Sequence, residues 1–193
     1  MILAPMKIGV IGAGVMGRGI AQVSAMADHQ VVLFDINHDV LKQAEIGVIK
    51  NLDKAIELGK LTADGKQSTI SNLTYSNSIA EVKADLIIEA IVERLDVKSK
   101  VLSDLAEING ESTIYASNTS SIPLTQIAAS FKYPTQVVGI HYFNPAHIMK
   151  LVEVISAEQT SQEVLEQAIA YVKSVGKKCI VAKDAPGFIV NRV

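Results

Sequence analysis

The sequence lacks the features that mark several large classes of protein. It holds a single cysteine, Cys179, among 193 residues, so no disulfide can form within the chain, which suits a reducing compartment. No basic run is longer than Lys177-Lys178, and the formal net charge is −2. These features give no sign of a nucleic-acid-binding surface or of a basic patch for acidic membranes.

Targeting and membrane-spanning segments are also missing from the sequence. Residues 1–5 are too short for a signal peptide, and a charged residue or glycine interrupts every long apolar stretch. We therefore expect a cytoplasmic protein with no membrane partner. Cysteine and acidic residues do not cluster at ligand spacing, so we expect no metal site.

The composition is that of an ordinary globular protein, with 49% hydrophobic and 20% charged residues. A chain of this length fits one domain, and we find no internal repeat, low-complexity tract or proline-rich linker. Ile180 and Val181 follow Cys179, which favours a buried strand there over a reactive thiol.

Short β-branched or apolar runs alternate with segments of helical periodicity along the whole chain. We expect strands at residues 6–11, 31–34, 72–75, 86–88, 113–116, 136–141, 151–155 and 178–181. We expect helices at residues 15–27, 39–58, 62–70, 95–108, 123–129 and 162–175. This alternation predicts an α/β fold of the Rossmann type: a doubly wound, mostly parallel sheet, with an antiparallel segment near the C-terminus.

The last ten residues, 184–193, have the pattern of a helix start, with Asp184 as its cap and Pro186 early in the first turn. The sequence ends shortly afterwards on the apolar residue Val193. We therefore expect residues 1–193 to form one domain of a longer protein.

A glycine-rich loop joins the first predicted strand to the first predicted helix, in the pattern G-x-G-x-x-G. The loop consists of Gly12, Ala13, Gly14, Val15, Met16 and Gly17. The pattern alone is weak, but a preceding strand and a following helix are the context that dinucleotide binding requires. Such glycines allow a tight turn, a close approach of the pyrophosphate and close helix packing.

Asp35 ends the second predicted strand, where a carboxylate can accept hydrogen bonds from the ribose hydroxyls of a dinucleotide. A carboxylate there would repel a 2′-phosphate, so the sequence favours NAD over NADP. The competing interpretation is a turn needed only for packing, with Asp35 as a helix cap.

Polar side chains follow several of the predicted strands, at the edge of the sheet where ligands bind in open α/β folds. They are Asp35, Glu89 with Glu93, the run from Ser117 to Ser121, and His141. We therefore expect one site along this edge.

His141 and Glu153 should face each other across two antiparallel strands. If residues 137–142 and 150–155 pair around a turn centred on His147, positions 141 and 153 are directly opposed. An imidazole held by a carboxylate is suited to act as a general base. A hydrogen-bonded core histidine and a surface glutamate remain the alternative. His147 is a rival base in the expected turn, whereas His29 and His38 are expected to face solvent.

Taken together, five segments resemble the L-3-hydroxyacyl-CoA dehydrogenases of fatty-acid β-oxidation and related pathways. They are IGAGVMGRGIAQ, ADLIIEAIVERLDVK, ASNTSS, GIHYFNPAHIMKLVEVI and KDAPGFIVNRV, and they span essentially the whole chain after Pro5 in the family's order. The resemblance implies reversible, NAD-dependent oxidation of an L-3-hydroxyacyl-CoA to a 3-ketoacyl-CoA.

The resemblance also implies roles for individual residues. His141 corresponds to the family's general base, Glu153 to its acidic partner, and Ser120 and Asn191 to the residues that bind the reacting oxygen. Further cofactor contacts are implied for Met16, Glu93, Lys98, Ser120 and Asn144.

The CoA contacts depart from the family's pattern. A family serine on the second helix is replaced by Asn51, and a family lysine falls near Leu58, so Asn51, Lys54, Lys60 and Ser120 are the candidates for contact with the substrate. The resemblance also implies a following helical C-terminal domain, absent from residues 1–193, that forms much of the acyl pocket and the homodimer interface. We therefore expect residues 1–193 alone to bind NAD(H) with weak turnover.

Two other functions remain open from the sequence. A dehydrogenase of a free 3-hydroxy acid would keep the same polar edge with a different pocket. A non-catalytic NAD-binding module would need the glycine loop but not Ser120, His141, Glu153 and Asn191 together.

Overall fold

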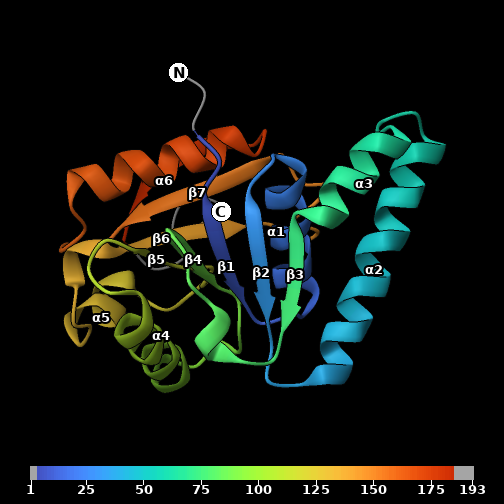
Figure 1. Cartoon of the computed structure of the whole chain (residues 1–193). Helices are drawn as coiled ribbons and strands as arrows, with labels where there is room; N and C mark the ends of the chain where they lie inside the picture. The colour runs from blue at the N-terminus through green and yellow to red at the C-terminus, as the bar shows by residue number, and fades with distance from the viewer. Residues whose placement is uncertain (1–3, 185–193) are drawn as a thin grey trace.

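A computed structural model describes residues 4–184 of the chain and contains one eight-stranded sheet (Figure 1). The strand order is β3-β2-β1-β4-β5-β6-β7-β8. Neighbouring strands are parallel except β6 and β7, which pair antiparallel. The strands are β1 (Lys7–Ile11), β2 (Gln30–Phe34), β3 (Leu73–Ser76), β4 (Leu86–Glu89), β5 (Ile114–Ser117), β6 (Val137–Tyr142), β7 (Leu151–Ser156) and β8 (Lys178–Lys183).

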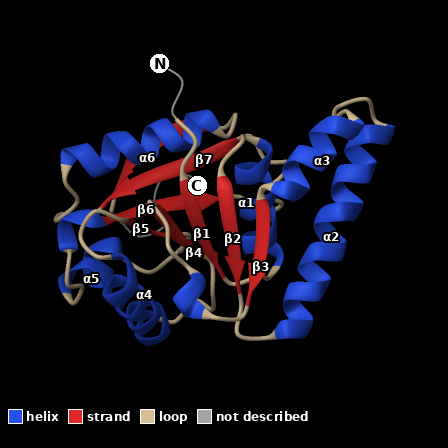
Figure 2. Cartoon of the chain, in the orientation of Figure 1, coloured by secondary structure: helices blue, strands red, loops and turns tan. Residues whose placement is uncertain are grey.

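Helices cover both faces of this sheet, as Figure 2 shows, and each face has its own apolar core. One core includes side chains of α1, α2 and α6, and the other includes side chains of α4 and α5. The helices are α1 (Val15–Met26), α2 (His38–Glu57), α3 (Ala63–Ser71), α4 (Leu95–Asn109), α5 (Leu124–Ala129) and α6 (Gln162–Ser174). The predicted doubly wound fold, with an antiparallel pair near the C-terminus, is confirmed.

Short polar side chains begin three of the helices. The side chain of Asn37 accepts hydrogen bonds from the first turn of α2, Thr62 does so for α3, and Ser161 for α6. Two 3₁₀ helices, η1 (Ile79–Glu81) and η2 (Pro134–Gln136), were not predicted, because single turns of this kind have no apolar periodicity to detect.

Two local predictions were wrong in part. His29 is buried rather than facing solvent: its Nδ1 accepts the Met6 N–H at 3.1 Å, and its Nε2 lies 2.9 Å from Ser174 Oγ. Cys179 lies in β8 and is half-buried, because β8 is an edge strand with exposed side chains.

Asp184 was predicted to cap a helix that begins at its own position. Among the described residues, its two carboxylate oxygens accept the N–H groups of Leu124 (3.0 Å) and Thr125 (2.7 Å) at the start of α5. The remainder of that predicted helix lies outside the described residues.

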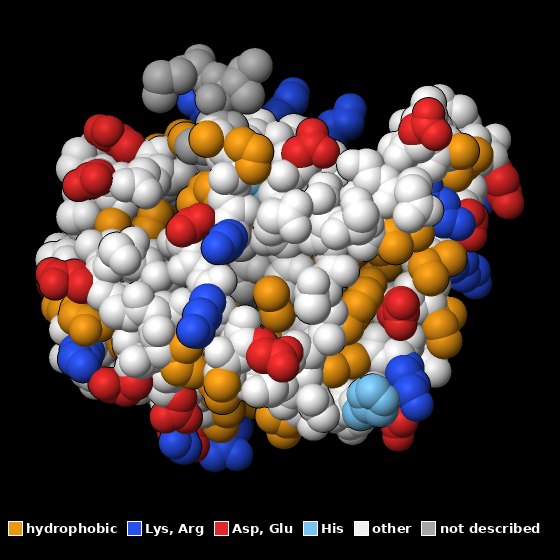
Figure 3. Space-filling model, viewed as in Figure 1, with side chains coloured by type: hydrophobic (Ala, Val, Ile, Leu, Met, Phe, Trp, Pro, Cys, Tyr) orange, Lys and Arg blue, Asp and Glu red, His pale blue; other side chains and the backbone are white. Residues whose placement is uncertain are grey.

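Within residues 4–184, no helix is both long and apolar enough to cross a membrane. On the face drawn in Figure 3, acidic and basic side chains are interspersed, and neither sign forms a continuous patch.

Candidate active site and cofactor site

The glycine loop adopts the conformation that a dinucleotide site needs. Gly12 has φ +96°, a backbone conformation that favours glycine. A Cβ at Gly17 would overlap the carbonyl oxygen of Gly12, so the helix can approach the turn only with glycine there. A Cβ at Gly14 would meet nothing within 4 Å, which leaves open space beside the backbone at the start of α1. No side chain among the described residues caps that helix end, so its N–H groups remain suited to a phosphate.

Asp35 belongs to the glycine loop rather than to a helix cap. Its Oδ2 accepts the Ala13 N–H at 2.8 Å and its Oδ1 accepts the Asn37 N–H at 2.9 Å, whereas Asn37 itself caps α2. The interpretation of Asp35 as a helix cap is therefore wrong. It borders a cavity of about 400 Å³, the Asp35 cavity, which is otherwise mostly apolar and is lined by Ile11, Gly12, Gly14, Phe34, Asp35, Ile36, Val40, Ala90, Ile91, Val92, Val97 and Val101.

A second cavity, of about 310 Å³, lies beyond the ends of β4, β5 and β6. This His141 cavity is lined by Met16, Ala90, Ile91, Glu93, Lys98, Asn118, Ser120, His141, Tyr142, Phe143 and Asn144. It shares Ala90 and Ile91 with the Asp35 cavity, so the two are neighbours along one edge of the sheet. The cavity thus brings together six residues that the sequence predicted for the site: Met16, Glu93, Lys98, Ser120, His141 and Asn144.

Behind this cavity, His141 and Glu153 form a buried pair. The predicted register is confirmed, because His141 of β6 is directly opposite Glu153 of β7. Nδ1 of His141 lies 2.8 Å from Glu153 Oε2, and the two side chains are only 7% and 0% exposed. The ring of Phe143 packs against the imidazole at 4.7 Å between centroids. Burial and the carboxylate together fix the orientation of the imidazole.

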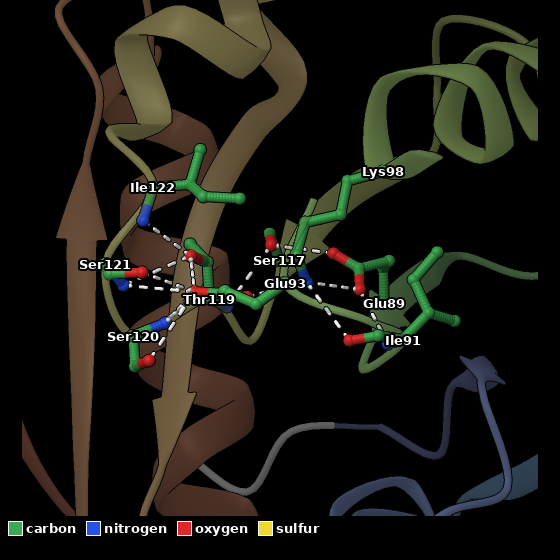
Figure 4. A network of polar contacts seen from close by, with 9 residues as sticks. All are labelled: Glu89, Ile91, Glu93, Lys98, Ser117, Thr119, Ser120, Ser121 and Ile122. Carbon is green, nitrogen blue, oxygen red and sulfur yellow. Dashed lines mark hydrogen bonds and ion pairs between the residues drawn. The ribbon is translucent and has the colours of Figure 1, made fainter. Parts of the chain in front are cut away.

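A polar network connects Glu93, Lys98 and Ser120, which all line the His141 cavity (Figure 4). Glu93 Oε1 accepts hydrogen bonds from Thr119 Oγ1 (2.6 Å) and from the N–H groups of Ser120 (2.9 Å) and Ser121 (3.1 Å). Its Oε2 lies 3.2 Å from Lys98 Nζ. Desolvation raises the pKa of Glu93, but the hydrogen bonds from Thr119 and Ser120 and the charge of Lys98 outweigh it and lower the pKa to about 2.

Sequence reasoning did not assign a role to two residues of this site. The Asn118 side chain accepts the Tyr142 N–H at 2.8 Å and so joins the loop after β5 to the end of β6. Glu89, noted only as part of the polar edge, is fully buried and binds Lys98 at 2.7 Å. The sequence did contain a signal for the role of Glu89, because an acidic residue at the end of an apolar strand indicates a buried carboxylate that needs a partner.

Of the residues expected to contact CoA, Ser120 lines the His141 cavity, whereas Asn51 and Lys54 lie on α2 and Lys60 lies just after its end. Asn51 and Lys54 line a groove of about 500 Å³ with Ile46, Ile49, Lys50, Asp53 and Glu57, and Lys60 is not among its lining residues. Asn51 Nδ2 donates to Gln22 Oε1 at 2.9 Å, and Lys54 pairs with Glu57.

The other candidates can be placed briefly. His147 lies in the connection between β6 and β7, where burial and the charges of Arg18 and Lys177 lower its pKa. His38 is exposed at the start of α2. Asn191 lies outside the described residues. Among residues 4–184 no group of three or more His, Cys, Asp or Glu residues could hold a metal ion.

Comparisons with known proteins agree with this geometry. Residues 7–185 match the family model described as 3-hydroxyacyl-CoA dehydrogenase, NAD binding domain. The 3-hydroxyadipyl-CoA dehydrogenase of Escherichia coli (strain K12) is 45% identical over 194 residues, a match that covers 100% of this chain and 41% of that protein. The mitochondrial hydroxyacyl-coenzyme A dehydrogenase of Sus scrofa is 42% identical over 191 residues, covering 95% of this chain and 61% of that protein.

Among solved structures, the 3-hydroxybutyryl-CoA dehydrogenase of Escherichia coli K12 has a TM-score of 0.95 at 44% identity, covering 98% of this chain and 40% of the other. This chain thus spans 41% and 61% of the length of the two curated relatives it matches. The glycine loop, Asp35 and the adjoining cavities fit a dinucleotide, and the family model is specifically the NAD-binding domain. The chain therefore belongs to the 3-hydroxyacyl-CoA dehydrogenase family and comprises the NAD-binding domain of that family.

Proposed function

We propose that this chain provides the cofactor site and the general base of an enzyme that reversibly oxidises an L-3-hydroxyacyl-CoA to a 3-ketoacyl-CoA. The observation that carries the proposal is the buried contact of 2.8 Å between His141 Nδ1 and Glu153 Oε2 beside a cavity that Ser120 also lines. A module that only binds NAD has no need of a buried, carboxylate-held imidazole next to its cofactor.

The oxidation begins with removal of the proton from the substrate's 3-hydroxyl group. Since Nδ1 of His141 is engaged by Glu153, Nε2 is the nitrogen that takes this proton. Glu153 then stabilises the imidazolium, which would otherwise be a costly charge in a buried position. General base catalysis of this kind contributes about 10²–10⁴-fold to a rate.

Ser120 and Asn191 complete the proposed catalytic set by donating hydrogen bonds to the substrate's 3-oxygen as its charge develops. Ser120 follows β5, and its N–H and hydroxyl both lie near Glu93 Oε1, at 2.9 and 3.5 Å. Because Glu93 holds the loop, the Ser120 hydroxyl is kept at the cavity wall.

NAD, when bound, supplies the hydride acceptor of the reaction. We infer that Asp35 binds the adenosine ribose, and that the backbone of residues 12–17 binds the pyrophosphate. Met16, Glu93, Lys98, Ser120 and Asn144 then surround the nicotinamide half in the His141 cavity.

For the CoA moiety we propose the groove on α2, where Asn51 and Lys54 offer an amide and an ammonium group. Lys60 lies just beyond the C-terminal end of α2 and could reach a phosphate there. We further propose that the enzyme is a homodimer, and that residues 1–193 alone bind NAD(H) better than they turn over substrate.

The test is reduction of NAD by L-3-hydroxybutyryl-CoA, compared with free L-3-hydroxybutyrate under the same conditions. The proposal predicts NADH formation from the thioester and little from the free acid. A preference for the free acid would favour a free 3-hydroxy acid dehydrogenase. NADH binding without reduction of NAD by any 3-hydroxyacyl-CoA, in this chain or in a longer form of the protein, would favour the non-catalytic module.

A further inference from the structure

Glu89 is a buried carboxylate that the proposed reaction does not use. It ends β4 and is fully buried, yet each of its oxygens has a partner. Oε1 accepts the Ile91 N–H and lies 2.7 Å from Lys98 Nζ, while Oε2 accepts the Ser117 hydroxyl at 2.8 Å. A buried ionised carboxylate is tolerated only when it is paired in this way. Its three partners come from the loop after β4, from α4 and from the end of β5.

Lys98 joins Glu89 to the wall of the His141 cavity. Its side chain is 1% exposed, and Nζ has three acceptors within 3.5 Å: Glu89 Oε1, Glu93 Oε2 and the carbonyl oxygen of Ile91. An ammonium group has three N–H donors, so these acceptors account for all of them. The effect of Lys98 on a bound cofactor is therefore transmitted chiefly through Glu93.

Glu93 divides its two oxygens between Lys98 and the loop that carries Ser120. Oε2 faces Lys98, while Oε1 accepts from Thr119, Ser120 and Ser121. Without Lys98 the carboxylate would lose the contact that fixes its second oxygen, and it could rotate. Figure 4 shows Glu93 between Lys98 and residues 119–121, and the loop contacts on Oε1 require the carboxylate to keep this orientation.

We propose that Glu89 and Lys98 are positioning residues of the nicotinamide half-site. Glu89 holds Lys98, Lys98 orients Glu93, and Glu93 holds residues 119–121 so that Ser120 lies at the wall of the His141 cavity. This inference rests on the proposed function, since it takes the nicotinamide to occupy that cavity. It adds Glu89 to the residues that shape the cofactor site. It also gives Lys98 a second role, the orientation of Glu93, which is separate from direct contact with the cofactor.

The decisive variant is the double substitution E89Q/K98M. Each single substitution risks unfolding, because it leaves one buried charge without its partner. The double variant removes both charges and so avoids an unpaired ion, but it still deprives Glu93 Oε2 of Lys98. If the network serves only stability, the double variant should bind NADH as wild type does. If the network positions Glu93, the NADH affinity of the double variant should stay reduced.

Calorimetric titration with two ligands separates these outcomes. ADP reports on the glycine loop and Asp35, and NADH reports on both halves of the cofactor site. The chain contains no tryptophan, so the emission of bound NADH can be followed without indole fluorescence. K100M is the matched control, because Lys100 lies on the same helix but is exposed and pairs with Asp104.

We expect E89Q/K98M to melt near the wild-type temperature and to bind ADP within about two-fold of wild type. Its Kd for NADH should rise by about ten-fold, with a shifted emission maximum of the bound nicotinamide. The inference is overturned if the double variant binds NADH as wild type does with the same emission, or if it loses ADP and NADH affinity equally. Failure of wild type to bind NADH would instead contradict the proposed function.

Discussion

His141 and Glu153 are held 2.8 Å apart by the pairing of β6 with β7, not by a loop. In both strands, the residues before and after the pair are buried, so side chains on both faces of the sheet are packed there. Their relative position is therefore as rigid as the sheet itself. A base that must take a proton in one orientation benefits from such support, because small misplacements of a catalytic group are costly.

The first prediction concerns the carboxylate of that pair. Glu153→Gln keeps the shape of the side chain but cannot stabilise an imidazolium, so turnover should fall by about 10²–10⁴-fold. NADH affinity should stay close to wild type, because Glu153 does not line the His141 cavity. The rates are measured in the full-length protein, as NADH formation from L-3-hydroxybutyryl-CoA. Glu158→Gln, an exposed glutamate just after β7, is the control and should leave the rate unchanged.

The second prediction separates two glycines of the loop by their surroundings. Gly14→Ala should leave the unfolding midpoint unchanged, because its Cβ would meet no atom of the protein within 4 Å. It should nevertheless raise the Kd for NADH by about ten-fold, since the methyl group occupies space that the pyrophosphate approaches. Gly17→Ala should also destabilise the fold, by about 1–3 kcal/mol, because its Cβ overlaps the Gly12 carbonyl. Equal melting temperatures for the two variants would refute this distinction.

A third prediction tests whether Asp35 selects the cofactor. Asp35→Asn keeps an oxygen that can accept the Ala13 N–H, but it removes the negative charge. The ratio of NADPH to NADH affinity should therefore rise by about ten-fold, since a 2′-phosphate is no longer repelled. Fluorescence titrations with the two reduced cofactors measure the ratio. An unchanged ratio would mean that another residue excludes the phosphate.

The fourth prediction concerns stability in acid. Burial lowers the pKa of His29 below its ordinary value of 6.5, with a smaller opposing effect from Asp28. Below pH 6.5 the unfolded chain therefore binds a proton at this ring that the folded chain resists, and the free energy of unfolding falls as the pH falls. His29→Asn should be less stable at pH 7 but lose stability less steeply between pH 6.5 and 5. Urea unfolding at several pH values gives the slopes, and identical slopes would exclude His29 as the cause.

Much of the fold could be predicted because its signals are local. Apolar runs, helical periodicity and the glycine loop each lie within about twenty residues. The opposition of His141 and Glu153 was also predictable, because one turn centre fixes the register of an antiparallel pair.

What could not be predicted depends on partners that are distant in the sequence. The burial of His29 follows from its contact with Ser174, 145 positions away. Asp184 caps α5 because β8 returns to the start of a helix 60 positions earlier in the sequence. Glu89 and Lys98 are only nine positions apart, yet their pairing depends on how α4 packs beside the end of β4. Periodicity and motif spacing carry no information about such contacts.

The central claim is that His141 is the base of a 3-hydroxyacyl-CoA dehydrogenase, and one pair of measurements tests it most directly. In the full-length protein, wild type and His141→Gln are compared for NADH formation from L-3-hydroxybutyryl-CoA, with the Kd for NADH measured in parallel. The account predicts that the variant binds NADH as wild type does but turns over about 10²–10⁴-fold more slowly. A variant that keeps both wild-type affinity and most of the wild-type rate would contradict it.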